Sequence, residues 1–557
     1  MKWLNENSRK FLAAGYLKDG DAPEKRIREI ANYAESILKI NGFADKFYGY
    51  MEEGFYSLST PVWTNFGTKR GLPISCFGSY VGDNMGSILF TLAEAGMMSK
   101  FGGGTSGFFG ELRPRGALIK SDKGSSSGSV HFMSLFDRMV DVVSQGSTRR
   151  GQFSPYLPIE HRDADEFLDI GTEGNPIQKL TYGVTVTDQW MTEMIGGDKN
   201  KRKLWAKVLE RRSQIGYPYI FFTDNVNKNA ADVYKEKGLK IHASNLCTEI
   251  ALPSNEEWSF VCCLSSINLL HYKRWKDTDA VETLVYFLDA VMSDFIQKLE
   301  ELRDSNDKEK QSAFTFMERA YNFSVDNRAL GLGALGWHSL LQSKLISFES
   351  REAAKLNAEI FKTIQKRAYS ASEELAKIFG EPSVLKGYKR RNTTLCAIAP
   401  TTSSAFILGQ VSQSIEPLFS NYYVKDIDKI KVTIKNPILE NLLEKKEKND
   451  KETWHSIRDH DGSVQHLKFL SEYEKGVFKT FSEINQYTIV DQAAIRQQYI
   501  DQGQSLNLMI NPMTPPKDIN ALYIHAWRSG VKTLYYQHSM NAAQNLNRKK
   551  VCVSCEA

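Results

Sequence analysis

Seven residues near the middle of the chain, Ser244-Asn-Leu-Cys-Thr-Glu-Ile250, place a thiol between an amide and a carboxylate. Asn245, Cys247 and Glu249 alternate along this segment, so in an extended backbone their side chains share one face. These three residues could form a catalytic unit. The Cys247 sulfur would act as nucleophile or radical, Glu249 as general base, and the Asn245 amide would hold a substrate hydroxyl. A buried cysteine in a polar strand is the alternative that this segment alone leaves open.

The remaining thiols differ in what their spacing suggests. They are Cys76, Cys262, Cys263, Cys396, Cys552 and Cys555. An odd total of seven, with no apolar leader, favours reduced thiols over a disulfide framework. Only Cys552 and Cys555 have CxxC spacing, which suits a redox pair or half of a zinc site, although zinc wants four ligands and the nearest upstream candidate is His538. Cys396 lies in an apolar stretch and is expected to be a packed core thiol.

Composition indicates a large globular protein. Of 557 residues, 41% are hydrophobic and 25% charged, which is enough for a sizeable core. The net charge of +5 gives no electrostatic case for nucleic acid as the main partner. No apolar run approaches the ~20 residues that cross a bilayer. We therefore expect a soluble, cytoplasmic protein without a membrane partner.

The alternation of predicted helices and strands along the sequence indicates an α/β protein. Amphipathic helices are expected over residues 1–58, and the sequence changes from Thr60 to short apolar segments separated by Gly, Pro and Ser. Further helices are predicted over 130–143, 281–302 and 351–379, and strands over 182–187 and 395–399. A loop is expected at 144–152, and a solvated helix end or an insertion at 442–452. Such alternation favours a largely parallel sheet.

Two later segments could also carry chemistry. Pro400-Thr-Thr-Ser-Ser404 offers four hydroxyls after an apolar stretch, which would hold phosphate oxygens if a helix starts there. An ordinary N-cap would use only one of these hydroxyls. Tyr535 and Tyr536 form an adjacent aromatic pair, which in many proteins is simply part of the core.

Six segments in one order resemble the large, catalytic α subunit of ribonucleotide reductase, from about residue 58 to the C-terminus. They are Thr60-Pro-Val-Trp-Thr-Asn-Phe-Gly-Thr with Leu-Pro-Ile-Ser-Cys76, the segment around Cys247, Cys262-Cys-Leu-Ser-Ser-Ile-Asn-Leu269, Ala399-Pro-Thr-Thr-Ser-Ser-Ala405, Leu534-Tyr-Tyr-Gln537, and the terminal CxxC. The resemblance implies a barrel of ten strands in two five-stranded halves with a central finger loop. It also implies three parts of the chain: a short helical region at 1–58, the barrel at 59–545 with dimerisation and effector elements at about 80–152, and a flexible redox-active tail at 546–557.

The resemblance assigns roles to the thiols. Cys247 at the tip of the finger loop would become a thiyl radical that removes the 3'-hydrogen of the ribose, Glu249 would take the 3'-hydroxyl proton, and Asn245 would hydrogen-bond nearby. Cys76 and Cys262 would reduce the 2'-position and become a disulfide, which supplies two electrons. Their Cα atoms must then lie within roughly 7 Å. Cys263 leaves the assignment ambiguous by one position, and Cys262 keeps the register of the following Leu-Ser-Ser-Ile-Asn-Leu.

By the same resemblance, the substrate is lined by Thr60, Ser75, Gly104, Pro400, Thr401, Thr402, Ser403 and Ser404. Thr402 stands where relatives often carry Ala or Glu. Tyr535 and Tyr536 would carry a radical from a small subunit, whose metal or tyrosyl oxidant generates it, so that no cofactor or metal is tightly bound in this chain. An adenosylcobalamin-dependent reductase would not need this pair, and a glycyl-radical relative would carry an Arg-x-x-Gly-Tyr-like element. A non-catalytic nucleotide-binding or redox-sensing relative would have lost Cys247 or Glu249.

Regulation and partners follow from the resemblance as well. A nucleoside triphosphate effector at a homodimer interface would contact Asp83, Arg113, Gln145, Gly146, Ser147, Thr148, Arg149 and Arg150. A solvent-exposed turn is the plainer interpretation of the glycine-flanked arginines. Cys552 and Cys555 would pass electrons from thioredoxin or glutaredoxin to the inner pair. Because few residues precede Thr60, the usual ATP-sensing domain is expected to be missing, and effectors are expected to change substrate preference without switching the enzyme off.

Overall fold

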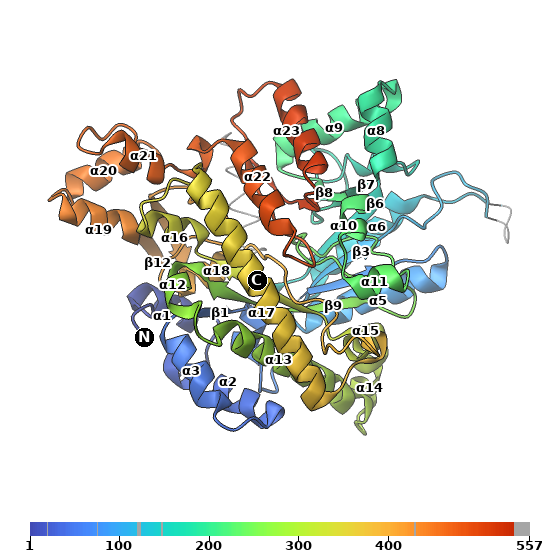
Figure 1. Ribbon diagram of the computed structural model, residues 1–557. Helices are drawn as coiled ribbons and strands as arrows, with labels where there is room; N and C mark the ends of the chain where they lie inside the picture. Colours follow the sequence, from blue (N-terminus) through green and yellow to red (C-terminus); the bar gives the residue numbers. More distant parts are fainter. Residues whose placement is uncertain (19, 75, 120–123, 146–148, 428–429, 540–557) are drawn as a thin grey trace.

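Five neighbouring strands of the central sheet run parallel. The structure, a computed structural model, describes residues 1–539 apart from 19, 75, 120–123, 146–148 and 428–429 (Figure 1). The strands are β2 (Cys76–Tyr80), β3 (Gly104–Phe108), β6 (Gln152–Pro158), β7 (Gly183–Val186) and β8 (Tyr219–Phe222), which pair in this order. The helices between and after them are α5 (Met85–Lys100), α6 (Ser129–Val142), α7 (Ala164–Phe167), α8 (Asp188–Gly196), α9 (Lys199–Ile215), α10 (Thr223–Lys228) and α11 (Asp232–Glu236).

A second group of five segments mirrors the first. β9 (Phe260–Asn268) pairs in parallel with β10 (Leu330–Leu335), and single parallel bridges continue from Leu332 to Cys396 and from Ile398 to Gln504. β13 (Leu508–Met509) then pairs with β15 (Gln537–His538), which follows β14 (Thr533–Leu534). The strand predicted over 395–399 is thus present only as two bridges. Parallel strands covered on both faces are apolar on both sides, which explains the short apolar runs in the sequence.

Two antiparallel junctions close the barrel. β2 pairs with β9 through Cys76–Gly78 and Phe260–Cys262, and β8 pairs with β14 through Ile220–Phe221 and Thr533–Leu534. Each half therefore contacts the other along both of its edges. The predicted ten-stranded α/β barrel of two five-stranded halves is confirmed.

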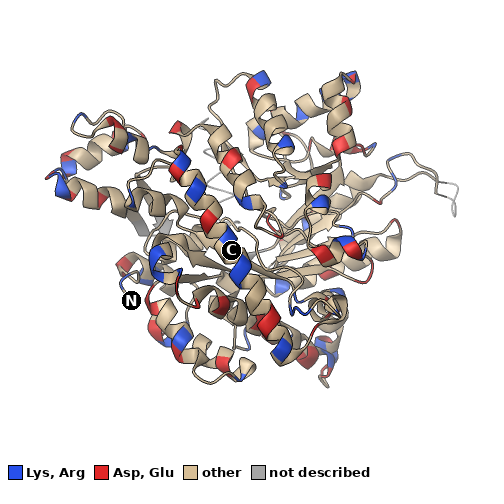
Figure 2. Cartoon of the chain, viewed as in Figure 1, with Lys and Arg blue, Asp and Glu red and all other residues tan. Residues whose placement is uncertain are grey.

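Long helices cover the second half. They are α13 (Ala280–Arg303), α17 (Arg351–Phe379), α22 (Gln486–Gln497) and α23 (Pro516–Arg528), with the shorter α12 (Tyr272–Trp275), α14 (Lys308–Thr315), α15 (Glu318–Asn327), α16 (Trp337–Ser343) and α18 (Thr402–Ile407). α17 crosses the front of the molecule in Figure 1. Ser350 caps it by accepting a hydrogen bond from the Ala353 amide, and buried residues such as Ile360 and Ile364 recur at helical spacing. In Figure 2 charged residues of both signs lie along these outer helices.

The N-terminal helices pack onto the barrel and share its core. α1 (Glu6–Ala13), α2 (Pro23–Leu38) and α3 (Phe43–Glu52) precede β1 (Tyr56–Leu58), which pairs antiparallel with β9, and α4 (Thr60–Asn65). The rings of Phe47 and Phe287 lie 4.3 Å apart, and those of Phe11 and Phe406 5.1 Å apart. The helices expected over 1–58 are therefore present, and they contact the segment that follows Pro400.

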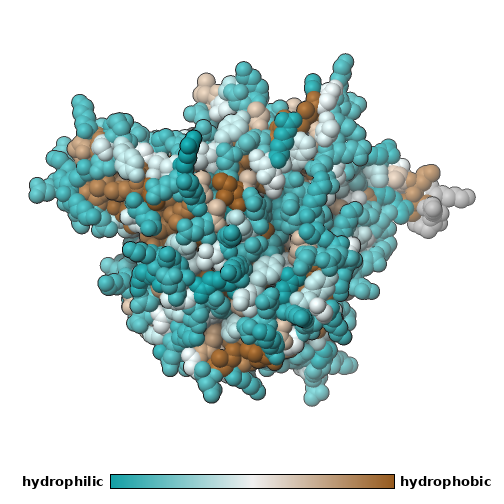
Figure 3. Space-filling view, in the orientation of Figure 1, coloured by the Kyte–Doolittle hydropathy of each residue, from teal (hydrophilic) through white to brown (hydrophobic). Residues whose placement is uncertain are grey.

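A small lobe has a hydrophobic core of its own. It contains α19 (Pro437–Lys445), α20 (Lys451–Asp459) and α21 (Glu472–Val477), beside the hairpin of β11 (Tyr422–Ile427) and β12 (Ile430–Lys435). Its buried residues include Leu439, Leu443, Trp454 and Ile457. The lobe lies on the left in Figure 1, where Figure 3 shows apolar surface. The sequence analysis expected a helix end or insertion at 442–452, and did not predict a separate core. Among the described residues, no helix has the length and apolar character to span a membrane.

Candidate active site

The Cys247 segment forms a turn rather than the extended strand that the sequence analysis assumed. The Thr248 amide donates to the Asn245 carbonyl at 3.3 Å, and Thr248 has a left-handed backbone with φ 71°. The Asn245 side chain folds back, so that its Oδ1 accepts the Ile250 amide at 3.1 Å. Because a side chain satisfies the backbone here, the segment can turn sharply without a strand partner. The expected shared face of an extended strand is therefore wrong.

Contacts from both halves hold this finger loop inside the barrel. Ser106 on β3 donates to the Ser244 carbonyl at 2.8 Å, and Tyr156 on β6 donates to the Asn245 carbonyl at 2.9 Å. From the other half, the Gly503 amide donates to the Glu249 carbonyl at 2.7 Å. The loop thus spans the barrel interior, where Cys247 is only 9% exposed.

The carboxylate and the amide of the loop lie beside Cys247. Ser505 Oγ contacts both the Cys247 carbonyl, at 2.5 Å, and Glu249 Oε2, at 3.1 Å. Glu249 and Asn245 are each 1% exposed. Asn245 Nδ2 is buried and has no hydrogen-bond acceptor among the described protein atoms, so it can donate to a ligand. The loop therefore combines a thiol, a base and an available donor in a site that excludes bulk water.

Cys76 and Cys262 face each other across the β2–β9 junction. They are direct partners in the antiparallel ladder, where opposed Cα atoms lie about 4.5–5.5 Å apart. This satisfies the distance that a disulfide requires. Gln502 Nε2 lies 3.4 Å from Cys262 Sγ, and burial raises the pKa of the Cys262 thiol well above its usual range. The thiol is therefore protonated at neutral pH, as a donor of a proton or hydrogen atom must be.

The neighbouring Cys263 has different surroundings. Burial raises the pKa of its thiol as well, and the other groups that act on this pKa are Asp289 on α13, Cys76 and Arg328. Successive side chains of a strand point to opposite faces, so only one of the two adjacent cysteines can share the face of Cys76. The register supports Cys262. Cys396 is 2% exposed, as expected of a core thiol.

The hydroxyl-rich segment begins a helix, as the phosphate interpretation requires. α18 starts at Thr402, and Thr401 before it has a left-handed backbone with φ 54°. Thr401 Oγ1 accepts the Ser414 amide at 2.7 Å, while Ser404 Oγ contacts the Leu58 carbonyl at 3.4 Å. Ser403 Oγ is buried without a partner among the described atoms. Some hydroxyls of this segment thus serve the fold, and Ser403 is available to a ligand.

The other predicted substrate residues lie in several elements. Gly104 begins β3 directly opposite Cys76, so the strand brings its backbone to the thiol pair. Thr60 begins α4, where its hydroxyl lies 3.3 Å from the Tyr16 hydroxyl. Ser75 lies outside the described residues, as do Cys552 and Cys555.

The tyrosine pair is buried at the other junction. Tyr535 and Tyr536 are 2% and 7% exposed, and their ring centroids lie 4.3 Å apart. Tyr219 on β8 joins them: its hydroxyl donates to the Tyr536 hydroxyl at 2.8 Å, and its ring lies 4.9 Å from that of Tyr535. The fully buried Arg212 donates to the Tyr535 carbonyl at 2.8 Å. The sequence analysis missed Tyr219, although Tyr-Pro-Tyr at 217–219, directly before the apolar Ile-Phe-Phe at 220–222, was a signal.

The proposed effector residues lie apart from the thiols. Arg113 Nε donates to Asp83 Oδ2 at 2.8 Å, and both side chains are about one-third exposed. Gln145 ends β4 (Ser144–Gln145), which pairs with β5 (Arg149–Arg150), while 146–148 lie outside the described residues. The adjoining α5 and α6 expose four large apolar side chains: Met85, Leu89, Leu135 and Val142.

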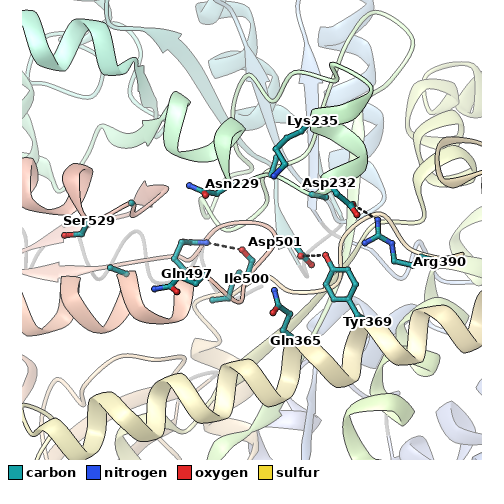
Figure 4. A pocket seen from close by; sticks show the side chains of 15 residues that line it. Asn229, Asp232, Lys235, Gln365, Tyr369, Arg390, Gln497, Ile500, Asp501 and Ser529 are labelled. Carbon is teal, nitrogen blue, oxygen red and sulfur yellow. Dashed lines mark hydrogen bonds and ion pairs between the residues drawn. The ribbon is translucent and has the colours of Figure 1, made fainter. Parts of the chain in front are cut away.

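A polar cavity of about 500 Å³ is lined by Asp232, Tyr369, Arg390 and Asp501 among other residues (Figure 4). Asp501 accepts hydrogen bonds there from the Tyr369 hydroxyl and the Leu395 amide, each at 2.7 Å. Leu395 starts the strand segment whose other end is Pro400. The buried Lys532 donates to the Asp501 carbonyl at 2.6 Å. These contacts join the starts of the three barrel segments that begin near Leu395, Asp501 and Lys532.

Comparisons with known proteins agree with this geometry. The family described as "Ribonucleotide reductase, barrel domain" matches residues 74–201, 195–390 and 383–537. The ribonucleoside-diphosphate reductase large subunit of Invertebrate iridescent virus 3 is 31% identical over 606 residues, covering 95% of this chain and 92% of that one. The ribonucleoside-diphosphate reductase subunit alpha of Chlamydia trachomatis is 28% identical over 591 residues, covering 90% of this chain and 55% of that one.

A solved structure is similar over nearly the whole chain. It is the class Id ribonucleotide reductase alpha subunit of Actinobacillus ureae, with a TM-score of 0.90, 55% identity, and coverage of 98% of both chains. The chain therefore belongs to the ribonucleotide reductase family, as a large, or α, subunit of class I.

Proposed function

We propose that the barrel reduces ribonucleoside diphosphates to 2'-deoxyribonucleotides through a thiyl radical at Cys247. The observation that carries this proposal is the Cys76–Cys262 register beside a buried loop that holds Cys247 and Glu249. The Cys247 radical takes the 3'-hydrogen, and Glu249 takes the 3'-hydroxyl proton. The 2'-hydroxyl leaves as water with a proton from one thiol of the pair, the other thiol supplies the hydrogen that C2' gains, and the pair becomes a disulfide that has supplied two electrons. Cys247 finally returns its hydrogen to C3', and Glu249 returns its proton to the 3'-oxygen.

Substrate placement is assigned to the α18 segment and its surroundings. Ser403 and the first backbone amides of α18 would bind the diphosphate, with Pro400, Thr401, Thr402 and Ser404 shaping the same segment. Gly104 would let the ribose approach Cys76 closely, because it presents no side chain. Asn245 Nδ2 would hold a ribose hydroxyl.

Class I large subunits work with a small subunit, and we propose that the radical arrives from it through Tyr536 and Tyr535. An apolar groove of about 420 Å³ between α8, α9 and α23 suits the docking of that subunit, and its lining includes Ile195, Trp205 and Ile524. Tyr523 on α23 hydrogen-bonds Arg212 at 2.7 Å, and Arg212 in turn holds Tyr535. The ring of Tyr523 also lies 6.4 Å from that of Trp205 in the groove lining, so Tyr523 links the groove to Tyr535 through Arg212. In this proposal the oxidant's metal or tyrosyl radical belongs to the partner.

We further propose that Asp83, Arg113 and the β4–β5 hairpin bind a nucleoside triphosphate at a homodimer interface. The exposed apolar side chains of α5 and α6 support this, because soluble proteins seldom leave such clusters uncovered. We also propose that the reaction takes place in the cytoplasm, because thiols are kept reduced there.

The deciding experiment is CDP reduction by the purified chain. Activity should appear on addition of the small subunit with a dithiol reductant, and adenosylcobalamin should not replace it. Activity with adenosylcobalamin alone would contradict the two-subunit proposal, and no reduction under either condition would contradict the enzyme assignment.

A second experiment concerns electron delivery by Cys552 and Cys555 from thioredoxin or glutaredoxin. With both replaced by Ser, about one turnover per site is expected before the enzyme stops with Cys76 and Cys262 oxidised, since the inner pair stores only two electrons. Single-turnover quantification of dCDP checks this. Sustained turnover with thioredoxin as sole reductant would show that the tail is not needed.

A further inference from the structure

The loop 408–419, which follows α18, contacts the proposed phosphate segment and is linked to Tyr536 through Asn507 and His538. Its Ser414 amide donates to Thr401 Oγ1 at 2.7 Å, and both residues have left-handed backbones, with φ 49° and 54°. Gln410 in the same loop also has a positive φ, of 60°. Non-glycine residues hold such conformations only where their surroundings enforce them, and they concentrate at functional sites. The shape of the loop is therefore linked to the shape of the phosphate segment.

Glu416 lies on the inner side of this loop. Its carboxyl group is 1% exposed and accepts hydrogen bonds from Gln413 Nε2 at 3.2 Å and from Asn507 Nδ2 at 2.5 Å. Among the described residues, no Lys, Arg or His forms an ion pair with it. Burying a carboxyl group without a cation costs free energy, which its hydrogen bonds offset only in part, so an apolar residue would be the cheaper choice if the position only filled space. Here it joins the loop to the strand segment of Asn507.

Asn507 extends the chain of contacts to Tyr536. Its Oδ1 accepts the Tyr536 amide at 3.1 Å, next to the ladder bond from the Leu508 amide to the Tyr536 carbonyl at 3.0 Å. The loop reaches the same place a second time, since the Phe419 ring lies 5.4 Å from His538 and the His538 ring 5.7 Å from Tyr536. Thr401, Ser414, Glu416, Asn507 and Tyr536 thus form one continuous path.

We propose that Glu416 is a positioning residue that couples occupancy of the phosphate segment to the placement of Tyr536. Substrate bound at α18 fixes Thr401 and therefore Ser414, and Glu416 transmits this position through Asn507 to the tyrosine backbone. The radical then reaches a correctly placed pair only when substrate is present. This inference rests on the proposed function, because it takes the phosphate segment as the substrate site and Tyr536 as the relay.

The physical advantage of such coupling is the protection of the radical. A thiyl radical formed without substrate has no productive reaction, so a gate that responds to the diphosphate would limit its loss. A coupling of this kind needs an element with two arrangements whose balance substrate shifts. The loop fits this requirement, since it is irregular, is held at both ends and contains the strained backbone positions.

The test places a fluorine at Tyr536 and follows it without turnover. In the full chain carrying 3-fluorotyrosine at position 536, CDP should shift the ¹⁹F resonance. The shift should be lost in Glu416→Met, which fills similar space without an acceptor, and retained in Glu416→Gln, which keeps the acceptor for Asn507. Asn507→Ser interrupts the same path and should also abolish the shift, which keeps the test available if Glu416→Met does not fold. An unchanged CDP-dependent shift in Glu416→Met, or no shift in the parent protein, would overturn the proposal.

Kinetics with the small subunit provide the second readout. Glu416→Met should lower kcat by roughly ten- to a hundredfold, as misplacement of reacting groups does, while the KM for CDP changes little. Glu416→Gln should restore kcat, and Gln413→Ala, which removes only the other bond to the carboxyl group, should cost less. A rise in KM with unchanged kcat would show that Glu416 only supports the binding segment. If CDP shifts the ¹⁹F resonance as expected but neither the parent protein nor any variant reduces CDP, the proposed function is wrong. The structural link between the CDP site and Tyr536 would still be supported.

Discussion

The two junctions that close the barrel have the same antiparallel pairing but opposite surroundings. At the β2–β9 junction, Cys76 is partly exposed and faces the buried Cys262. At the β8–β14 junction, three tyrosines and Arg212 are packed together without access to solvent. A pair that must be oxidised and reduced again needs an approach for a second thiol, whereas a radical relay needs shielding from solvent. In the proposed mechanism the same strand geometry would serve two kinds of electron transfer, distinguished by access to solvent.

The finger loop lies between these junctions, and its thiol should be the most sensitive position. Cys247→Ser changes little volume but replaces a weak S–H bond by a much stronger O–H bond. Turnover of CDP should therefore fall below detection, while nucleotide affinity measured by calorimetry stays within about twofold. Residual turnover in the pure variant would show that Cys247 does not carry the radical. The tyrosines of one junction and the thiols of the other would then not act on the same residue.

Substitutions at the thiol junction should separate Cys262 from its neighbour. Cys262→Ala should abolish multiple turnover, since one thiol cannot form the disulfide. Cys263→Ala is the matched control: it should retain most activity and lose about 1 kcal/mol of stability through the missing buried sulfur. Steady-state dCDP formation and thermal melting measure the two effects. The reverse pattern would mean that β9 presents the other cysteine to Cys76.

Substitutions at the tyrosine junction should have graded effects. Tyr536→Phe keeps the ring packing but removes the hydroxyl that the relay oxidises, so turnover should fall by more than about a hundredfold. Tyr219→Phe removes only a hydrogen-bond partner of that hydroxyl and should cost about tenfold or less. Tyr182→Phe, whose hydroxyl donates to the Leu168 carbonyl at 3.0 Å, controls for the loss of a buried phenol. Equal losses in all three would indicate a structural effect rather than a relay.

The last prediction concerns stability rather than turnover: a pH dependence near the tyrosine junction. Burial raises the pKa of Glu416 from 4.5 to about 8. Between these values the unfolded chain has lost the proton and the folded chain keeps it, so the free energy of unfolding decreases as pH rises, by at most about 1.4 kcal/mol per pH unit. Glu416→Gln removes this dependence. Its melting temperature relative to the parent should rise from pH 5 to 8; a constant difference would contradict the raised pKa.

The barrel and its thiols were largely predictable from the sequence. The reason is that several distinctive motifs, such as the one around Cys247, follow one another in a fixed order along the chain. The turn at Thr248 was not, because it depends on the Asn245 side chain replacing a strand partner. Tyr219 was missed for a related reason, since its partner Tyr536 lies more than three hundred residues away. The separate core of the α19–α21 lobe was also missed, because apolar spacing shows that a helix is buried but not against which core. The roles of the site residues remain predictions.

The Cys76–Cys262 register has a thermodynamic consequence. The two residues lie 186 positions apart, so a disulfide between them would close a very long loop in the unfolded chain. In the chain-entropy description such a cross-link stabilises the folded state by at most about 5 kcal/mol. Each completed reduction would thus leave the enzyme briefly more stable than before, with the halves of the barrel covalently joined. Resistance to unfolding would then report how far the catalytic cycle has advanced.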